Sequence, residues 1–87
     1  MALKGMDTDA VRQLSAQMNH AQEQIRQLTQ QLSHSLNSVQ WVGPDREQFV
    51  NDWQSTHVSS LHNVAQAIEM AAQRATQNAS EQDNVSA

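Results

Sequence analysis

The apolar periodicity of residues 11–32, VRQLSAQMNHAQEQIRQLTQQL, determines the predicted architecture of this chain. Apolar side chains recur here at alternating steps of three and four, at Val11, Leu14, Met18, Ala21, Ile25, Leu28 and Leu32. This spacing places them along one side of an α-helix that packs against other helices. The series continues through Leu36 and Val39, and Asp7 to Asp9 supply an N-cap and favourable negative charge. We therefore predict a helix over residues 8–39.

The segment Gln40-Trp41-Val42-Gly43-Pro44 interrupts the pattern at the middle of the chain. Glycine permits a chain reversal, and proline is tolerated at the first position of a helix. A second apolar series then follows and thins to alanine, through Phe49, Val50, Trp53, His57, Leu61, Val64, Ile68, Ala71 (or Ala72) and Ala75. We predict a turn over residues 40–44 and a second helix over residues 44–76. Because the residues from Thr76 onward are almost all polar, we predict a flexible tail over residues 77–87.

These elements predict an all-α fold in one domain, residues 1–87, with two helices folded back as an antiparallel hairpin. An isolated hairpin covers only one side of each apolar series and leaves a long apolar strip in water. We therefore expect two hairpins to dimerise into a four-helix bundle. The core of the hairpin and of the dimer is expected to contain Val11, Leu14, Met18, Ile25, Leu28, Leu32, Leu36, Val50, Leu61, Val64 and Ile68.

Composition argues against several classes of function. Five Lys and Arg stand against nine Asp and Glu, so no basic surface is available for nucleic acid or for an anionic membrane. The chain has no cysteine, and its four histidines lack the spacing of a zinc site. No serine has a base beside it at catalytic spacing, and no glycine-rich loop is present to hold phosphate. We expect no enzymatic activity, no metal and no cofactor. His57, on the second apolar series, leaves pH-sensitive dimerisation as an alternative.

The sequence of the turn resembles the motif of a known family. Trp41-Val42-Gly43, central in a short two-helix chain and followed by Phe49 and Trp53, resembles the motif of the WXG family, the early-secreted-antigen-like proteins of type VII secretion. The resemblance covers nearly the whole chain in length, turn position and organisation. It implies an antiparallel dimer, formed with a second copy or with a sister protein, and export by a membrane-embedded ATPase. It also implies a non-catalytic role as a secreted effector, adaptor or co-secreted partner.

The sequence departs from the family pattern in its tail. Many members carry a Tyr followed four residues later by Asp or Glu, whereas this chain has no Tyr. We expect export without a cleavable signal peptide, since residues 1–10 contain no apolar segment of the required length. Either a partner supplies the export signal or recognition rests on other features.

Two interpretations of the turn remain open. Trp41, Phe49 and Trp53 close the end of the bundle as apolar packing, or Trp41 with Gly43 also contacts the secretion ATPase, as the resemblance implies. A cytosolic helical-bundle module unrelated to secretion is the alternative function. In that case the Trp-Val-Gly segment is only a turn.

Overall fold

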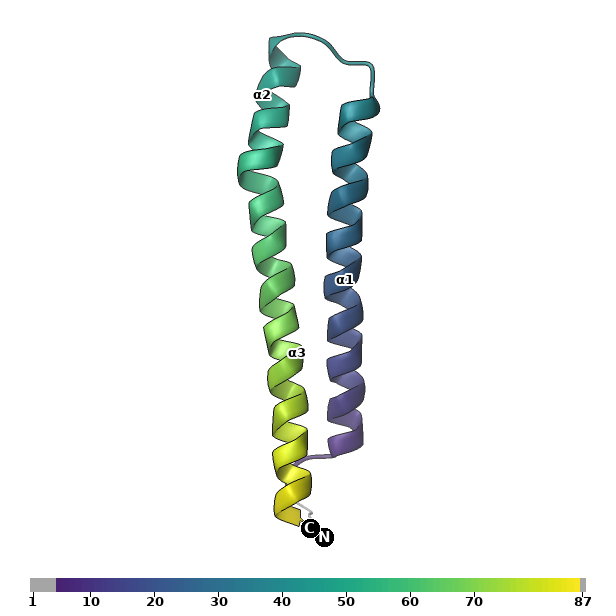
Figure 1. The fold of residues 1–87 in the computed structure, drawn as a ribbon, viewed down its shortest axis with the longest axis vertical. Helices are drawn as coiled ribbons and strands as arrows, with labels where there is room; N and C mark the ends of the chain where they lie inside the picture. The colour runs from purple at the N-terminus through teal and green to yellow at the C-terminus, as the bar shows by residue number, and fades with distance from the viewer. Residues whose placement is uncertain (1–4, 87) are drawn as a thin grey trace.

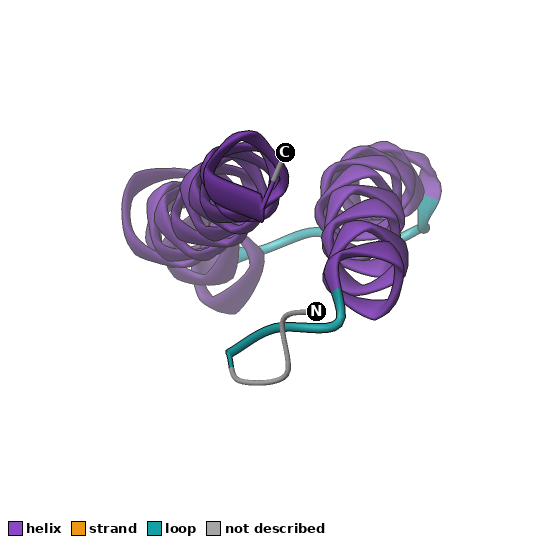
Figure 2. Ribbon diagram, turned by 90° about the horizontal axis from the view of Figure 1, so that it is seen from below, coloured by secondary structure: helices purple, strands orange, loops and turns teal. Residues whose placement is uncertain are grey.

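The computed structural model describes residues 5–86 as an antiparallel helical hairpin (Figure 1). The first arm is α1 (Thr8–Ser38). The second arm contains α2 (Pro44–Asp52), a π-helical segment η1 (Trp53–His57) and α3 (Val58–Ser86), which follow one another as a single rod. The molecule measures 66 × 17 × 14 Å, and the end-on view shows the two arms side by side without a further layer among the described residues (Figure 2). The predicted all-α hairpin is confirmed.

The ends of α1 lie close to their predicted positions. Asp7 is the N-cap, and its side chain accepts a hydrogen bond of 3.1 Å from the backbone N–H of Ala10. At the other end Val39 turns to an extended conformation, and its N–H still donates to the carbonyl of Ser35 at 3.0 Å. The aspartate therefore satisfies one of the free amides of the first turn, as its position in the sequence indicates.

The chain reverses through residues 39–43, and the reversal depends on Gly43. This residue is the N-cap of α2 with φ 128° and ψ 176°, a conformation that is essentially restricted to glycine. Its carbonyl accepts hydrogen bonds from the N–H groups of Arg46 and Glu47, at 3.1 and 3.2 Å. Pro44 occupies the first helical turn, where its missing N–H leaves no partner unsatisfied.

The two arms meet along a line of small and polar side chains, which we call the contact line. Its residues are buried and recur every seven positions on both helices: Ser15, Gln22 and Thr29 on α1, and Ala65, Ala72 and Ala79 on α3. Alanine and serine allow two helix backbones to approach closely. The interior of the hairpin is consequently thin, and no large side chain among the described residues is fully buried.

The large apolar residues predicted for the core lie beside the contact line and not on it. Four of them remain about half exposed: Leu14 at 46%, Leu28 at 56%, Leu32 at 54% and Val64 at 50%. The others are partly covered, namely Val11, Met18, Ile25, Leu36, Val50, Leu61 and Ile68. These four residues are not buried within the single hairpin, and their place in the core of a dimer stays a prediction. The apolar spacing alone did not distinguish the side of a helix that meets its own partner arm from the side next to it.

The π-helical segment corrects the phase of the second arm. The covered residues step by four and three through Arg46, Val50 and Trp53, and by three and four through Val58, Leu61 and Ala65, but a step of five separates Trp53 from Val58. A π-helical turn accommodates one additional residue within a helix, and here the N–H of Val58 bonds to the carbonyl of Trp53. The extra residue keeps Trp53 turned toward α1.

The second helix extends well past its predicted end near residue 76. It continues through Ser86, so the predicted flexible tail is helical over residues 77–86, while Ala87 lies outside the described residues. Ala79 is buried on the contact line, and Asp83 forms an ion pair of 2.7 Å with Arg12 of α1. Polar composition suggested disorder, but the small apolar residue at the seven-residue period continues the contact with α1.

We expect Gly43→Ala to destabilise the hairpin by about 1–3 kcal/mol, the usual range for a side chain forced into this backbone conformation. No heavy atom lies within 4 Å of the position that an alanine Cβ would occupy there, so the effect comes from backbone strain and not from a clash. Urea unfolding followed by circular dichroism measures it. Val42→Ala is the control, because Val42 is 92% exposed and should change the unfolding midpoint little. Equal midpoints for both variants would contradict the assignment.

We expect the end of α3 to loosen in acid. The hydrogen bonds from Arg12 and Thr8 hold the pKa of Asp83 below its ordinary value of 3.8. A lowered pKa in the folded state means that the carboxylate supports the fold above the unfolded pKa and loses this effect as pH falls below it. Backbone NMR shifts of residues 80–86 should therefore differ between wild type and Asp83→Asn at pH 7 and converge once the pH falls well below 3.8. Glu81→Gln removes the same charge without a contact to α1, and a similar change there would refute the role of the pair.

Candidate interaction surface

One face of the hairpin is polar and carries the ion pairs between its arms. A residue advances by about 100° around a helix, so positions three before and four after a contact-line residue fall on the same flank. Arg12 and Arg26 occupy this flank of α1, and Glu69 and Asp83 occupy the equivalent flank of α3. Arg12 pairs with Asp83 at 2.7 Å and Arg26 with Glu69 at 3.2 Å, so the two flanks form one face. These pairs are about 40% or more exposed, which makes them weak contributors to stability.

The opposite face is apolar. Positions four before, one before and three after a contact-line residue lie on the other flank of each arm, and in side-by-side antiparallel helices the equivalent flanks share one face. This apolar face contains Val11, Leu14, Met18, Ala21, Ile25, Leu28 and Leu32 from α1, and Leu61, Val64, Ile68, Ala71 and Ala75 from α3. None of these side chains carries a charge. The structure thus gathers most of the predicted core residues into one surface strip that runs along both arms.

An apolar groove lies at the turn end of the same face. Leu32, Ser35, Leu36 and Val39 of the first arm and Phe49 and Trp53 of the second line a hollow of ≈ 250 Å³. Trp53 is fixed there by a hydrogen bond of 2.8 Å from its Nε1 to the hydroxyl of Ser33. Because residues from both arms line one hollow, the groove supports the assignment of the two flanks to one face.

The tip of the hairpin exposes an aromatic pair. The rings of Trp41 and Phe49 lie 5.4 Å apart at an angle of 54°, a favourable tilted contact. Trp41 is 37% exposed and Phe49 is 49% exposed, so the contact between the two rings leaves a large part of each in water. Of the predicted turn residues, the structure brings Trp41 and Phe49 together, places Trp53 in the groove beside Phe49, and sets Gly43 at the start of α2.

One polar member of the contact line, Ser15, fixes how the arms align. The hydroxyl of Ser15 donates to the carbonyl of Ala72 at 2.7 Å, and it lies 2.6 Å from the hydroxyl of Thr76. Because its single proton is used on Ala72, Ser15 accepts from Thr76. On the same line Gln22 accepts from Nε of Arg26 at 2.7 Å. No described buried side-chain polar atom lacks a partner, so this polar line is satisfied within one chain.

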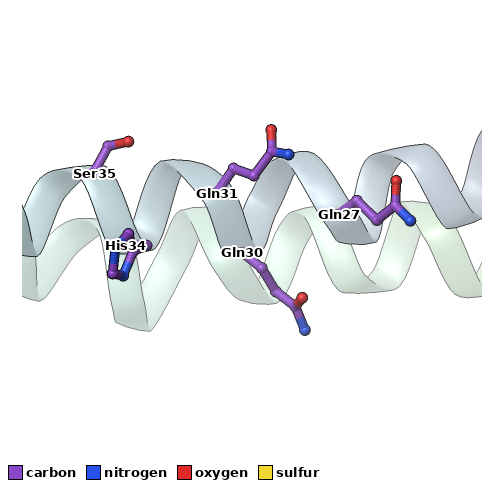
Figure 3. Close-up of a pocket in the computed structure, with 5 residues that line it drawn as sticks. All are labelled: Gln27, Gln30, Gln31, His34 and Ser35. Carbon is purple, nitrogen blue, oxygen red and sulfur yellow. The ribbon is translucent and has the colours of Figure 1, made fainter.

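The outer side of α1 carries an uncharged polar surface. Gln27, Gln30, Gln31, His34 and Ser35 border a wide, open depression. Their side chains spread from the helix in different directions and do not converge on one point (Figure 3). This surface lacks the convergent groups that orient a small ligand.

Residues 5–86 contain no grouping of three or more His, Asp or Glu side chains that could hold a metal ion. Within the same part of the chain, no helix combines the length and the apolarity needed to span a bilayer. The surface features that the structure does present are apolar: the uncharged apolar face, the groove and the aromatic pair at the tip.

Sequence reasoning missed the contact line, although a signal for it is present. Ser15, Gln22 and Thr29 recur with the same seven-residue period as Ala65, Ala72 and Ala79. Small residues at a seven-residue period indicate a close contact between two helices. The prediction of the core considered only large apolar residues and therefore did not include these positions.

Comparison of the chain with protein-family models, with curated proteins and with solved structures returned no match. The function is therefore inferred from the residues and from the geometry of the hairpin.

Proposed function

We propose that this chain is a non-catalytic interaction protein whose apolar face packs against a second helical hairpin to form a four-helix bundle. The observation that carries the proposal is the uncharged apolar face, which includes the half-exposed Leu14, Leu28, Leu32 and Val64. Burying such apolar surface against a partner is favourable, with a free energy of roughly 25 cal/mol per Å² removed from water. The partner is a second copy of the chain or a sister hairpin of the same kind.

The area of the molecule supports association. A compact monomer of 9.7 kDa exposes about 5,100 Å² by the usual scaling with mass, whereas this hairpin exposes 6459 Å². Its radius of gyration of 19.4 Å likewise exceeds the value of about 12 Å for a compact chain of this length. The excess surface is larger than the area that each partner buries in a standard-sized protein interface, about 800 Å².

We further propose that the protein is exported by a type VII secretion system and acts as a secreted effector, adaptor or co-secreted partner. The support is the resemblance of Trp41-Val42-Gly43, Phe49 and Trp53 to the WXG motif, together with the partial exposure of Trp41 at the hairpin tip. An exposed tryptophan next to a glycine presents a large ring and an unobstructed backbone to a partner such as the secretion ATPase. A cytosolic bundle module with the same apolar face is the alternative.

We expect the purified chain to form a dimer, and Leu28→Glu to weaken this dimer at least tenfold. The substitution places a carboxylate on the apolar face of both copies, where association would bury it without a partner. Analytical ultracentrifugation over a concentration series measures the dissociation constant.

Gln27→Glu is the matched control for this experiment. It adds the same charge one position away, on the outer polar surface of α1. The dimer should tolerate it. A wild-type chain that remains a fully helical monomer at millimolar concentration, or equal weakening by both variants, would refute association through the apolar face.

We expect export to depend on the tip. In a bacterium with a type VII system, the chain should appear in the medium only when the secretion ATPase is intact, and Trp41→Ala should reduce its amount at least tenfold. Val42→Ala, next in sequence and almost fully exposed, is the control. Immunoblots of medium and cells give the ratio. Retention of the wild-type protein in cells with an intact system would favour the cytosolic alternative.

A further inference from the structure

We infer that His57 makes association through the apolar face sensitive to pH, so that the bundle is stable near neutral pH and separates in mild acid. This inference rests on the proposed function, and it adds the regulation of the same surface. The direction and register of the partner hairpin do not enter it. What matters is that a partner on the apolar face covers the imidazole of His57.

His57 lies on the apolar flank of the second arm. Val58 stands seven residues before Ala65 and is partly covered, so it continues the period of the contact line. His57 comes one residue before Val58, just as Val64 comes one residue before Ala65, and this position falls on the apolar flank. In the single hairpin His57 is exposed to water. It is therefore an ionisable side chain on a face that otherwise presents uncharged apolar residues.

The π-helical segment is what brings His57 to this face. In an uninterrupted α-helix, the position four residues after Trp53 would be the next one turned toward α1, and that position is His57. Because η1 accommodates an additional residue, Val58 takes this place, and its N–H bonds to the carbonyl of Trp53. His57 is thereby displaced from the side that faces α1 to the flank beside it.

His57 also lies beside a wall of the groove. Its ring centroid is 6.0 Å from the ring centroid of Trp53, and the two planes make an angle of 48°. Trp53 lines the groove and is held there by its hydrogen bond of 2.8 Å to Ser33. A positive charge on the imidazole is consequently placed next to the most strongly apolar part of the interaction surface.

No ion pair of the described residues includes His57. Asp52, five residues earlier, is the nearest acidic residue along the second arm, and it forms no ion pair there either. The charged residue of α1 nearest the turn is Arg26, which pairs with Glu69 on the polar face. A second copy of the chain would bring the same uncharged apolar residues to the interface. Burial of a protonated imidazole without a counter-charge is costly, and attraction to the ring of Trp53 offsets only part of that cost.

The other three histidines lie off the apolar face. His62 stands four residues after Val58, a position on the polar flank. His34 borders the open depression on the outer side of α1. His20 stands two residues before the contact-line residue Gln22, which places it on the outer side of α1 as well. Protonation of these three side chains therefore adds charge where the proposed interface does not cover it.

The direction of the pH effect follows from where the proton binds. Histidine gains its charge in mild acid. The free hairpin binds this proton at an exposed His57, whereas the associated hairpin binds it only at the cost of a buried charge, so falling pH favours the free form. Asp83 does not interfere in this range, because its pKa lies below its ordinary value of 3.8 and its ion pair with Arg12 stays charged.

Sedimentation of the purified chain at about pH 8 and about pH 5.5 tests the inference, because histidine changes its charge between these values. We expect the dissociation constant of the wild-type dimer to rise at least tenfold in acid. His57→Gln cannot gain the charge, so its constant should change by roughly twofold or less. His34→Gln is the matched control on the outer side of α1, and it should keep the full wild-type change. Circular dichroism at both pH values establishes that each variant remains helical.

Fluorescence follows the pair of rings itself. Trp41→Phe leaves Trp53 as the single tryptophan of the chain. In the dilute free hairpin its emission should fall as His57 gains a proton, and the further substitution His57→Gln should abolish this change. Emission that is the same at both pH values would overturn the contact between the two rings as the sensor.

The outcomes separate this inference from the proposed function. A wild-type dimer of equal affinity at both pH values, or a His57→Gln dimer that keeps the full acid weakening, would overturn the role of His57 and leave association through the apolar face intact. A wild-type chain that stays a folded monomer at about pH 8 and millimolar concentration would overturn the proposed function, and the inference with it.

Discussion

The close contact between α1 and α3 along Ser15, Gln22, Thr29 and three alanines is the constraint on which the rest of the structure depends. Small side chains at a seven-residue period bring the two arms together without a thick interior. The large apolar residues are therefore displaced to one flank of each helix, and the ion pairs to the other. A hairpin with a bulky interior would have hidden its leucines, whereas this one presents them.

The same constraint accounts for the polar character of the contact line. A single hairpin has limited hydrophobic stabilisation, so its arms need another means of alignment. The hydroxyls of Ser15 and Thr76 bond to each other, and Ser15 also bonds to the backbone of α3. Hydrogen bonds between specific partners fix the register of the arms, which apolar contacts between similar residues do less strictly. The hairpin thereby presents its two flanks at defined levels along its length.

Much of the fold could be predicted from the sequence, and the reasons are local. Asp7 caps α1, and Gly43 with Pro44 starts α2, because these residue types satisfy or avoid free amides at helix ends. The extension of the second helix to Ser86 was missed, since its support comes from Arg12 and from burial of Ala79 against α1. The π-helical turn at Trp53 was missed for a similar reason. The predicted apolar series passed from Trp53 to His57 in an ordinary step of four, whereas in the structure the next covered residue is Val58, five positions on. The hydrogen bond from Trp53 to Ser33 shows that Trp53 itself faces α1.

The surface strip was predicted in composition but not in position. Leu14, Leu28 and Val64 are apolar residues of a helix seam, and the sequence alone does not say whether a seam faces its own partner arm or a neighbouring molecule. The structure resolves this through the contact line, which excludes them from the interior of the single chain. The hairpin leaves these regularly spaced apolar residues exposed on its surface. Their presence therefore needs an explanation other than the stability of the hairpin. Regular three- and four-residue spacing over the length of α1 is the geometry required for packing against another helix, so the strip itself is the main support for the proposal that this protein acts by association.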